Sequence, residues 1–354
     1  MTDVLNVKLA PFMTAFSVYF CTFAANFCKG PPGVMRVSVI IPVYNVSDYV
    51  ERCVRSVMDQ TYRDIECVIV DDCSPDDSIT KCERMIEAYE GPISFSIVRH
   101  ERNRGLSAAR NTGTEAATGD YVVYLDSDDA ITEDCIEKLV RPIGRDGSIE
   151  MVIGNHVRDV EGHRTCRRQQ ERELGSRDAI RDFFFCQRGF FVHACNRLVN
   201  RDFLIRHHIQ FTEGLLWEDN LWVFYLLKHL THIYIIPDAT YVYYLRPCSI
   251  TTGTASDKKA RHWQLVYGNI AQHFTEGESG KEARYFIRYI CLQLIRIQRG
   301  QDIHQISRPY LKALRRDRYW KVYLVYSVIV FMSRFGMGRS LLFSAVQKSL
   351  KKHS

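Results

Sequence analysis

Among the features this 354-residue chain lacks, the most informative are cysteine pairs and long apolar runs. Its 12 cysteines include no Cys-x-x-Cys pair and no Cys/His cluster at zinc spacing, so the sequence predicts no structural zinc. Their scatter favours a reducing compartment over a disulfide framework. The longest uncharged run of the C-terminal part, residues 322–333, is too short to span a bilayer.

The first 34 residues are uncharged between Lys8 and Lys29, yet proline and polar residues dilute their apolar character. Three interpretations stay open: a dispensable leader or misplaced start, a membrane anchor, and a cleaved signal. We favour the first, because a strand pattern begins directly after Met35.

Charge is divided unevenly along the chain. The net charge is +6, but residues 301–354 hold 11 Lys or Arg and two acids, so the remainder carries a net −3. This basic tail is also rich in aromatic and aliphatic residues, which suits peripheral contact with an anionic membrane surface. A core-packing helix with a solvated face explains the same pattern equally well.

Strand-like and helix-like segments alternate between residues 35 and 125. Short runs of β-favouring apolar residues recur, and between them apolar residues follow the 3.6-residue period of a helix. The alternation predicts an α/β fold with a mostly parallel, Rossmann-like sheet and helices on both faces. The expected strands span 37–43, 65–70, 93–98 and 121–125, and the expected helices begin near 47, 74 and 106.

After residue 130 the alternation is looser. We expect a helix over 133–143, a strand over 151–154, and a surface loop or hairpin over 160–170. Two strands at 232–236 and 240–245 would close the domain, and two helices would follow within 256–299.

Polar clusters follow three of the expected strands, at residues 44–45, 71–72 and 126–129. Parallel strands place their carboxyl ends at one edge of the sheet, where ligands bind, so the three clusters should converge. Asp126, Asp128 and Asp129 together favour a hard divalent cation, Mg²⁺ or Mn²⁺. A solvated acidic turn before a helix is the simpler alternative.

Five ordered segments carry a specific resemblance: 37–45 (VSVIIPVYN), 60–66 (QTYRDIE), 70–78 (VDDCSPDDS), 103–113 (NRGLSAARNTG) and 125–129 (LDSDD). With the acidic pair at 218–219, they resemble the family 2 glycosyltransferases of bacterial polysaccharide type, which have the GT-A fold. The resemblance covers residues 36–250 and includes neither the leader nor the tail.

The resemblance implies a nucleotide-diphosphate-sugar donor, with a UDP-sugar as the expected one. Pro42 and Tyr44 would wall the flat base, and the Tyr44 ring is available for stacking. Asn45 is expected in the same donor pocket. Asp72 would accept a hydrogen bond from uracil N3–H, its role in the family's matching motif.

The same resemblance assigns the diphosphate end of the donor. Asn103, Gly105 and Arg110 would contact phosphates and sugar hydroxyls, because arginine pairs well with phosphate. Asp126 and Asp128 match the family's Asp-x-Asp motif: one would contact ribose or metal, and Asp128 is the expected direct ligand of Mn²⁺ or Mg²⁺. The cation would neutralise the departing diphosphate.

Inversion in one displacement requires a base opposite the leaving group. By resemblance to the family's Glu-Asp motif we assign Asp219 as the base that deprotonates the acceptor hydroxyl, with Glu218 as a supporting acid. Trp217 and Trp222 would offer an apolar face to an acceptor sugar and desolvate the carboxylate. An acidic pair at a helix N-terminus is also a common structural feature.

Two departures from the family pattern stand out. Cys73 occupies a position where glycine is common, so a turn with positive φ there would be strained and would displace Asp72. The Gln-x-x-Arg-Trp motif of processive members is absent; the nearest match, residues 293–297, lacks the Trp. Single-sugar transfer is therefore expected.

Other functions fit less well. A nucleotidylyltransferase would need a Gly-rich phosphate loop after the first strand, and residues 42–45 supply none. A non-catalytic nucleotide-sugar-binding or membrane-associated scaffold protein remains the alternative, although it would not need both acidic motifs. The acidic body argues against nucleic acid as a partner.

The sequence therefore predicts three parts: a hydrophobic leader (1–34), a GT-A glycosyltransferase domain (35–250) and a helical C-terminal region with a basic tail (251–354). The expected enzyme is inverting and metal-dependent, and it transfers one sugar to a saccharide or lipid-linked acceptor. The expected location is cytoplasmic, peripheral at the cytoplasmic face of the membrane.

Overall fold

The structure, a computed structural model, describes residues 35–160, 162–166, 169–186, 192–245, 256–273, 283, 286–287 and 300–334. The expectations for residues 1–34, for most of the second helix within 256–299 and for the end of the basic tail lie outside these residues.

The N-terminal half alternates strands and helices, as predicted. The strand β1 spans Val37–Val43, and all seven of its residues are buried, because helices cover both faces of the sheet. The following elements are α2 (Val50–Met58), β2 (Ile65–Asp71), α3 (Ser78–Glu87), β3 (Ser94–Arg99), α4 (Leu106–Ala116), β4 (Tyr121–Tyr124), β5 (Ala130–Ile131) and α5 (Cys135–Val140).

The second half completes the sheet. Its elements are β6 (Met151–Val160), β7 (His163–Cys166), β8 (Arg172–Leu174), α6 (Arg177–Cys186), β9 (Arg197–Asn200), α7 (Arg201–Arg206), α8 (Asp219–His229) and β10 (Ile233–Tyr244). The predicted excursion at 160–170 contains a hairpin, because β7 pairs antiparallel with β6.

The strands form one sheet in the order β3-β2-β1-β4-β9-β6-β10-β5. Parallel pairs join β1 to β2 and β4, β2 to β3, and β6 to β10. The strand β9 is antiparallel to both β4 and β6, so β6 and β10 point the same way as the N-terminal strands. The α/β sheet is thus present but mixed rather than mostly parallel: β1, β2, β3 and β4 run parallel as predicted, whereas β5, β7, β8 and β9 pair antiparallel with their neighbours.

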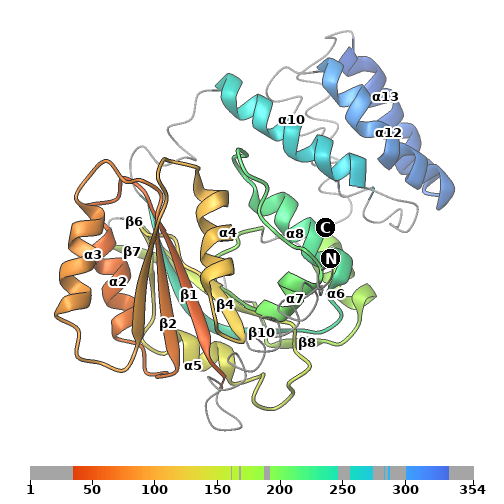
Figure 1. Ribbon diagram of the computed structural model, residues 1–354. Helices are drawn as coiled ribbons and strands as arrows, with labels where there is room; N and C mark the ends of the chain where they lie inside the picture. The colour runs from red at the N-terminus through yellow and green to blue at the C-terminus, as the bar shows by residue number, and fades with distance from the viewer. Residues whose placement is uncertain are drawn as a thin grey trace, which may run out of the picture.

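Two apolar cores lie on opposite faces of the sheet, beneath the helices that cover those faces in Figure 1. Residues Val39 and Ile41 of β1 pack with α2, α3 and α5 on one face. Ile40, which points the other way, packs in the core that contains residues of α6, α7 and α8. Gly113 of α4 lies against Ile40, where a Cβ atom would come within 2.3 Å of Ile40 Cγ2.

The prediction of two separate strands at 232–236 and 240–245 is wrong. The chain runs through this segment as the single strand β10, and its register against β6 shifts between Ile235 and Ala239 and again before Tyr241. Pro237 lies at the first shift. Proline cannot donate to the ladder and is tolerated at bulges, which explains why the sequence looks broken where the strand is continuous.

Three helices of the C-terminal region are described: α10 (Ser256–His273), α12 (Gly300–Arg316) and α13 (Trp320–Arg334). Figure 1 shows α10 above α8, and the two helices are in contact; α12 lies between α10 and α13. None of the helices within the described ranges combines the length and the apolar character that a membrane crossing needs.

Candidate active site

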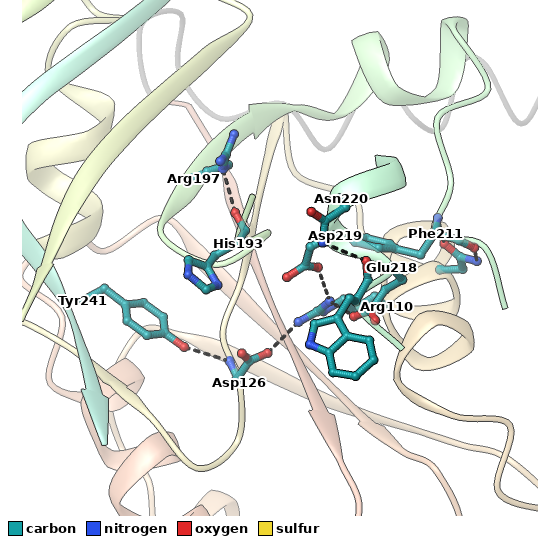
Figure 2. Close-up of polar contacts among 11 residues, drawn as sticks. Arg110, Asp126, His193, Arg197, Phe211, Glu218, Asp219, Asn220 and Tyr241 are labelled. Carbon is teal, nitrogen blue, oxygen red and sulfur yellow. Dashed lines mark hydrogen bonds and ion pairs between the residues drawn. The ribbon is translucent and has the colours of Figure 1, made fainter. Parts of the chain in front are cut away.

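Arg110 lies at the centre of a cluster of carboxylates at the carboxyl edge of the sheet (Figure 2). Its Nη2 donates to Asp126 Oδ1 at 2.8 Å. Its Nη1 donates to Glu218 Oε1 at 2.8 Å and to Asp219 Oδ1 at 2.9 Å. One buried guanidinium on α4 therefore joins the acidic turn after β4 to the acidic pair at the start of α8.

The charges in this cluster determine one another's protonation. Burial alone would lower the pKa of Arg110, but Asp219, Asp126 and Glu218 raise it well above its usual range, so the guanidinium stays charged. Burial raises the pKa of Glu218, and the negative charge of Asp219 raises it further. The charge of Arg110 opposes this rise in pKa but does not cancel it, so Glu218 tends to hold a proton.

Asp219 is the first residue of α8, and Glu218 is its N-cap. Carboxylates at this end of a helix are stabilised by the helix dipole. The Asp219 side chain is 19% exposed, whereas that of Glu218 is 7% exposed. Asp219 is therefore the more accessible acid of the pair.

The backbone just before this pair is strained. Trp217 has φ of 58°, a left-handed conformation that is a genuine outlier for a bulky side chain. Its carbonyl accepts from the backbone N–H of Asn220 at 3.1 Å and from Asn220 Nδ2 at 3.1 Å. Such strain costs about 1–3 kcal/mol and persists only where the surrounding structure enforces it.

The three acids of the Asp126–Asp129 turn differ in their environments. Asp129 is buried, and it accepts from Tyr241 Oη at 2.6 Å and from the Tyr244 backbone N–H at 2.9 Å. Burial and the charges of Asp126 and Asp128 raise the pKa of Asp129 to about 8. Asp129 therefore anchors the turn to β10.

Asp126 and Asp128 are the acids of this turn that remain partly exposed. Arg52 Nη2 donates to the Asp128 carbonyl at 2.7 Å and fixes the turn. Mg²⁺ is usually held by one or two carboxylates together with substrate phosphates, so this pair fits the predicted divalent cation.

Asp72 lies deep in the predicted donor pocket. Its Oδ1 accepts from the Arg104 backbone N–H and lies 2.7 Å from His100 Nδ1, and its Oδ2 accepts from the Gly105 backbone N–H. The side chain is 4% exposed. Through these hydrogen bonds, Asp72 holds the loop that leads into α4.

The remaining predicted donor residues lie at the ends of β1 and β3. Pro42 is buried within β1, whereas Tyr44 is 44% exposed and Asn45 is exposed. The backbone N–H of Asn45 donates to Ser74 Oγ at 2.8 Å, which brings the first two polar clusters together. Asn103 is exposed in the loop before α4, and Gly105, with φ of 89°, precedes that helix.

The expected strain at Cys73 is present. Cys73 has φ of 58°, as expected for a position where glycine is common. Asp72 is nevertheless held by three donors, and its backbone N–H donates to the Val43 carbonyl at 3.0 Å. The strain at Cys73 is therefore compatible with a firmly held Asp72.

One predicted role needs correction, and one residue makes contacts that the sequence did not predict. Trp222 is 1% exposed and stacks on Phe211 with ring centroids 4.8 Å apart, so it belongs to the core and cannot face an acceptor. Arg110, expected as a phosphate partner, uses both terminal nitrogens for carboxylates. Its position in the site was predicted, but its contacts were not.

Sequence reasoning missed His100 and Tyr241. His100 follows the carboxyl end of β3, so the rule that located the other clusters would have found it; its Nε2 lies 2.9 Å from Thr112 Oγ1. Tyr241, which holds Asp129, lies some 110 residues along the chain, and no local signal identifies it.

Within the described ranges, Asp146, Glu173 and His232 form a group of three side chains close enough to share a metal. Asp146 and His232 precede β6 and β10, so this group lies at the amino edge of the sheet, away from Asp126 and Asp219. His232 Nε2 lies 2.9 Å from Glu173 Oε1.

The sheet and its carboxyl edge define an α/β protein with a GT-A-like fold. Residues 38–207 match the family model described as "Glycosyl transferase family 2". For this part of the chain the match supports the family that the motifs predicted.

Curated relatives agree with this assignment. The chain is 26% identical over 261 residues to the uncharacterized glycosyltransferase EpsJ of Bacillus subtilis, a match that covers 72% of this chain and 74% of EpsJ. It is 39% identical over 121 residues to the glycosyltransferase GlyA of Streptococcus pneumoniae, which covers 34% of this chain but 17% of GlyA. Because the chain spans a small share of GlyA, the activity of GlyA as a whole says nothing about this chain.

Solved structures share the fold over most of the chain. S. aureus TarS 1–349 in complex with UDP-GlcNAc has a TM-score of 0.65 at 18% identity and covers 90% of this chain and 92% of its own. The mannosyltransferase PcManGT from Pyrobaculum calidifontis in complex with GDP-Man and Mn²⁺ has a TM-score of 0.52 at 17% identity, covering 97% and 96%. At 18% and 17% identity, these similarities show a shared fold alone.

Proposed function

We propose that this chain is an inverting glycosyltransferase that transfers one sugar from a nucleotide-diphosphate sugar to an acceptor hydroxyl. The observation that carries the proposal is the guanidinium of Arg110, which holds Asp126 of the turn after β4 and Asp219 of α8 at 2.8 and 2.9 Å. Two acids with different roles, donor binding and proton abstraction, are thereby fixed next to each other.

The donor would lie along the carboxyl edge of the sheet. Tyr44 and Asn45 are exposed there and would contact the base, with Pro42 beneath them and Asp72 behind. Asn103 and Gly105 would contact phosphates or sugar hydroxyls ahead of α4. The complexes of the similar folds with UDP-GlcNAc and GDP-Man support a nucleotide-sugar donor at this edge, and we favour a UDP-sugar.

Asp219 would act as the base. Its Oδ1 accepts from Arg110, which orients the carboxylate and leaves Oδ2 for the acceptor hydroxyl. The proton moves from the acceptor oxygen to Asp219 as that oxygen attacks the anomeric carbon and the bond to the diphosphate breaks. Glu218, buried and inclined to hold a proton, would limit the negative charge that Arg110 has to balance.

Asp126 and Asp128 would hold Mn²⁺ or Mg²⁺, and the Mn²⁺ complex of a similar fold supports this choice. When bound, the cation supplies positive charge beside the departing diphosphate. The chain's own contribution is to keep both carboxylates in place, through Arg110 on Asp126 and through Arg52 on the Asp128 carbonyl.

The helix α13 presents an apolar face to solvent. Trp320, Leu324, Val328 and Phe331 follow one another at helical spacing and are 49%, 60%, 55% and 61% exposed. The other face of α13 packs in the core, where Tyr326 and Val330 are buried. Because the exposed face is apolar rather than polar, we favour membrane contact as its role.

Positive charges lie next to this face. Arg315, Arg316, Arg318 and Lys321 are exposed at the end of α12 and the start of α13. Exposed apolar side chains beside basic residues suit the surface of an anionic membrane. We therefore propose peripheral attachment at the cytoplasmic face of the membrane, which would place the enzyme beside a saccharide or lipid-linked acceptor.

The decisive experiment is a panel of nucleotide sugars incubated with the protein, Mn²⁺ and candidate acceptors, with release of the nucleotide as the readout. One donor should be turned over well above the others. If no donor is bound or turned over, a non-catalytic role replaces the proposal; if donors bind without turnover, the scaffold alternative holds.

A further inference from the structure

The strained residue before the acidic pair is held by the C-terminal region. The indole of Trp217 stacks on Trp263 of α10, with ring centroids 4.8 Å apart and planes 11° from parallel. Trp263 in turn stacks on Tyr267 at 5.5 Å and 13°, and Tyr267 is buried. One face of Trp217 is thus covered by an aromatic column that belongs to α10.

A hydrogen bond from the preceding residue reaches the same helix. The backbone N–H of Leu216 donates to His262 Nδ1 at 3.1 Å. This contact requires a ring that is unprotonated at Nδ1. Burial, with the charges of Lys258 and Arg261, lowers the pKa of His262 and favours that neutral form.

Two successive residues of the 216–217 segment are therefore held by two successive residues of α10. A left-handed bulky residue relaxes unless its surroundings enforce the conformation. Were Trp217 to relax, the start of α8 would turn, and Glu218 and Asp219 would leave the reach of the Arg110 guanidinium.

We infer that His262 and Trp263 are positioning residues for the base, so that α10 sets where Asp219 lies although it contributes no group to the reaction. This inference rests on the proposed function of Asp219. It also gives the C-terminal region a second role, because α10 completes the active site whereas α13 faces outward.

The test uses the full chain and the donor identified by the panel. Trp263→Ala removes the stack and His262→Ala removes the acceptor, whereas Trp263→Phe keeps a ring and His262→Asn places an oxygen near the position of Nδ1. Leu265→Ala, an exposed apolar residue on the same helix, is the matched control.

We expect the two alanine variants to lower kcat at least tenfold and to leave the donor KM within about twofold, as follows when an interaction acts in the transition state only. The Phe and Asn variants should recover most of the loss, and Leu265→Ala should match the wild type. A folded Trp263→Ala protein with wild-type kcat overturns the inference. A rise in donor KM that accounts for the whole loss also overturns it, because α10 would then shape the donor pocket.

Hydrogen–deuterium exchange separates this inference from the proposed function. The backbone amides of residues 218–222 should exchange at least tenfold faster in Trp263→Ala and His262→Ala than in the wild type, because the start of α8 is no longer held. Exchange in Trp263→Ala that equals the wild type overturns the inference whatever the activity. Faster exchange in the alanine variants of a protein that turns over no donor overturns the proposed function instead.

Discussion

Asp126 and Asp219 bind the same guanidinium, at 2.8 and 2.9 Å, although one follows a strand and the other begins a helix far along the chain. Arg110, which joins them, comes from a third element, α4. A base and a donor-binding acid can be placed this close without mutual repulsion only because a buried positive charge lies between them. The first two predictions test this arrangement.

Asp219→Asn should lower kcat by about 10²–10⁴-fold, the usual contribution of a general base, and should leave the Kd for the donor nearly unchanged. The amide retains an oxygen for Arg110 but cannot accept a proton. Calorimetry with the nucleotide sugar, beside rates of nucleotide release, checks both parts. Glu218→Gln is the matched control and should cost less than tenfold, because a glutamine resembles the protonated acid. Equal losses in the two variants would reassign the base.

Arg110→Met should lower the free energy of unfolding by about 3–5 kcal/mol, because it leaves buried carboxylates without their counter-charge. The loss should be smaller in an Asp219→Asn background, where one of those charges is already removed. Urea unfolding of the wild type, the two single variants and the double variant measures this coupling. Strict additivity would show that Asp219 and Arg110 do not stabilise each other.

Asp128→Asn should raise the Mn²⁺ concentration needed for half-maximal activity at least tenfold, and a chelator should abolish turnover by the wild type. The variant keeps the backbone carbonyl that accepts from Arg52, so the turn itself should persist. Activity titrated with Mn²⁺ is the measurement. Full activity of the chelated wild type would remove the cation from the mechanism.

Leu324→Asp combined with Phe331→Asp should abolish most binding to vesicles that contain anionic lipid, because it places negative charge on the exposed face of α13. Ile205→Asp is the control: Ile205 is 49% exposed, but it lies on α7, away from the basic tail. Vesicle co-sedimentation at low and physiological salt measures the effect. Equal binding by all three proteins would contradict the proposed membrane contact.

Glu66→Gln should lower the free energy of unfolding at pH 7 by about 1–3 kcal/mol, the range for hydrogen bonds to a charged group. Glu66 accepts from Ser38, Thr118 and Gly119; burial opposes ionisation, but these donors outweigh it and lower the pKa of the carboxyl below 4.5. Because the pKa of Glu66 is lower in the folded protein than in the unfolded chain, its ionised carboxylate stabilises the fold at pH values above the unfolded-state pKa. This stabilisation is lost as the pH falls through the folded-state pKa.

The difference in the free energy of unfolding between wild type and Glu66→Gln should therefore be constant above about pH 5 and shrink below about pH 4. Thermal unfolding from pH 3 to pH 8 checks this, with the exposed Glu90→Gln as control. A difference that persists unchanged at pH 3 would mean that the ionised carboxylate is not what stabilises this corner of the sheet.

Local pattern was enough to predict the framework. The strands and helices up to β4 lie within a few residues of the predicted bounds, because each buries a face whose period is visible in the sequence. The convergence of residues 44–45, 71–72 and 126–129 followed from a property of all parallel sheets. The ordered motifs also predicted the family, and residues 38–207 match the model of that family.

Contacts between distant segments could not be predicted this way. The sequence shows Arg110 as a polar residue near a helix start, but only the tertiary structure decides that its partners are carboxylates 16, 108 and 109 residues away. The same holds for Trp222, whose surroundings make it a core residue, and for β10, which continues across a proline because β6 pairs with it on both sides of the bulge.

The sequence by itself thus determined which residues are chemically able to act: the acids at 126, 128 and 219 and the polar ends of the strands. Tertiary structure alone decided how they are held. Arg110 joins the two acidic segments, and α10, outside the region of family resemblance, supports Trp217. The physical reason is that residue type and period are local properties, whereas the burial of a charge and the enforcement of a strained backbone depend on which distant segments pack against it.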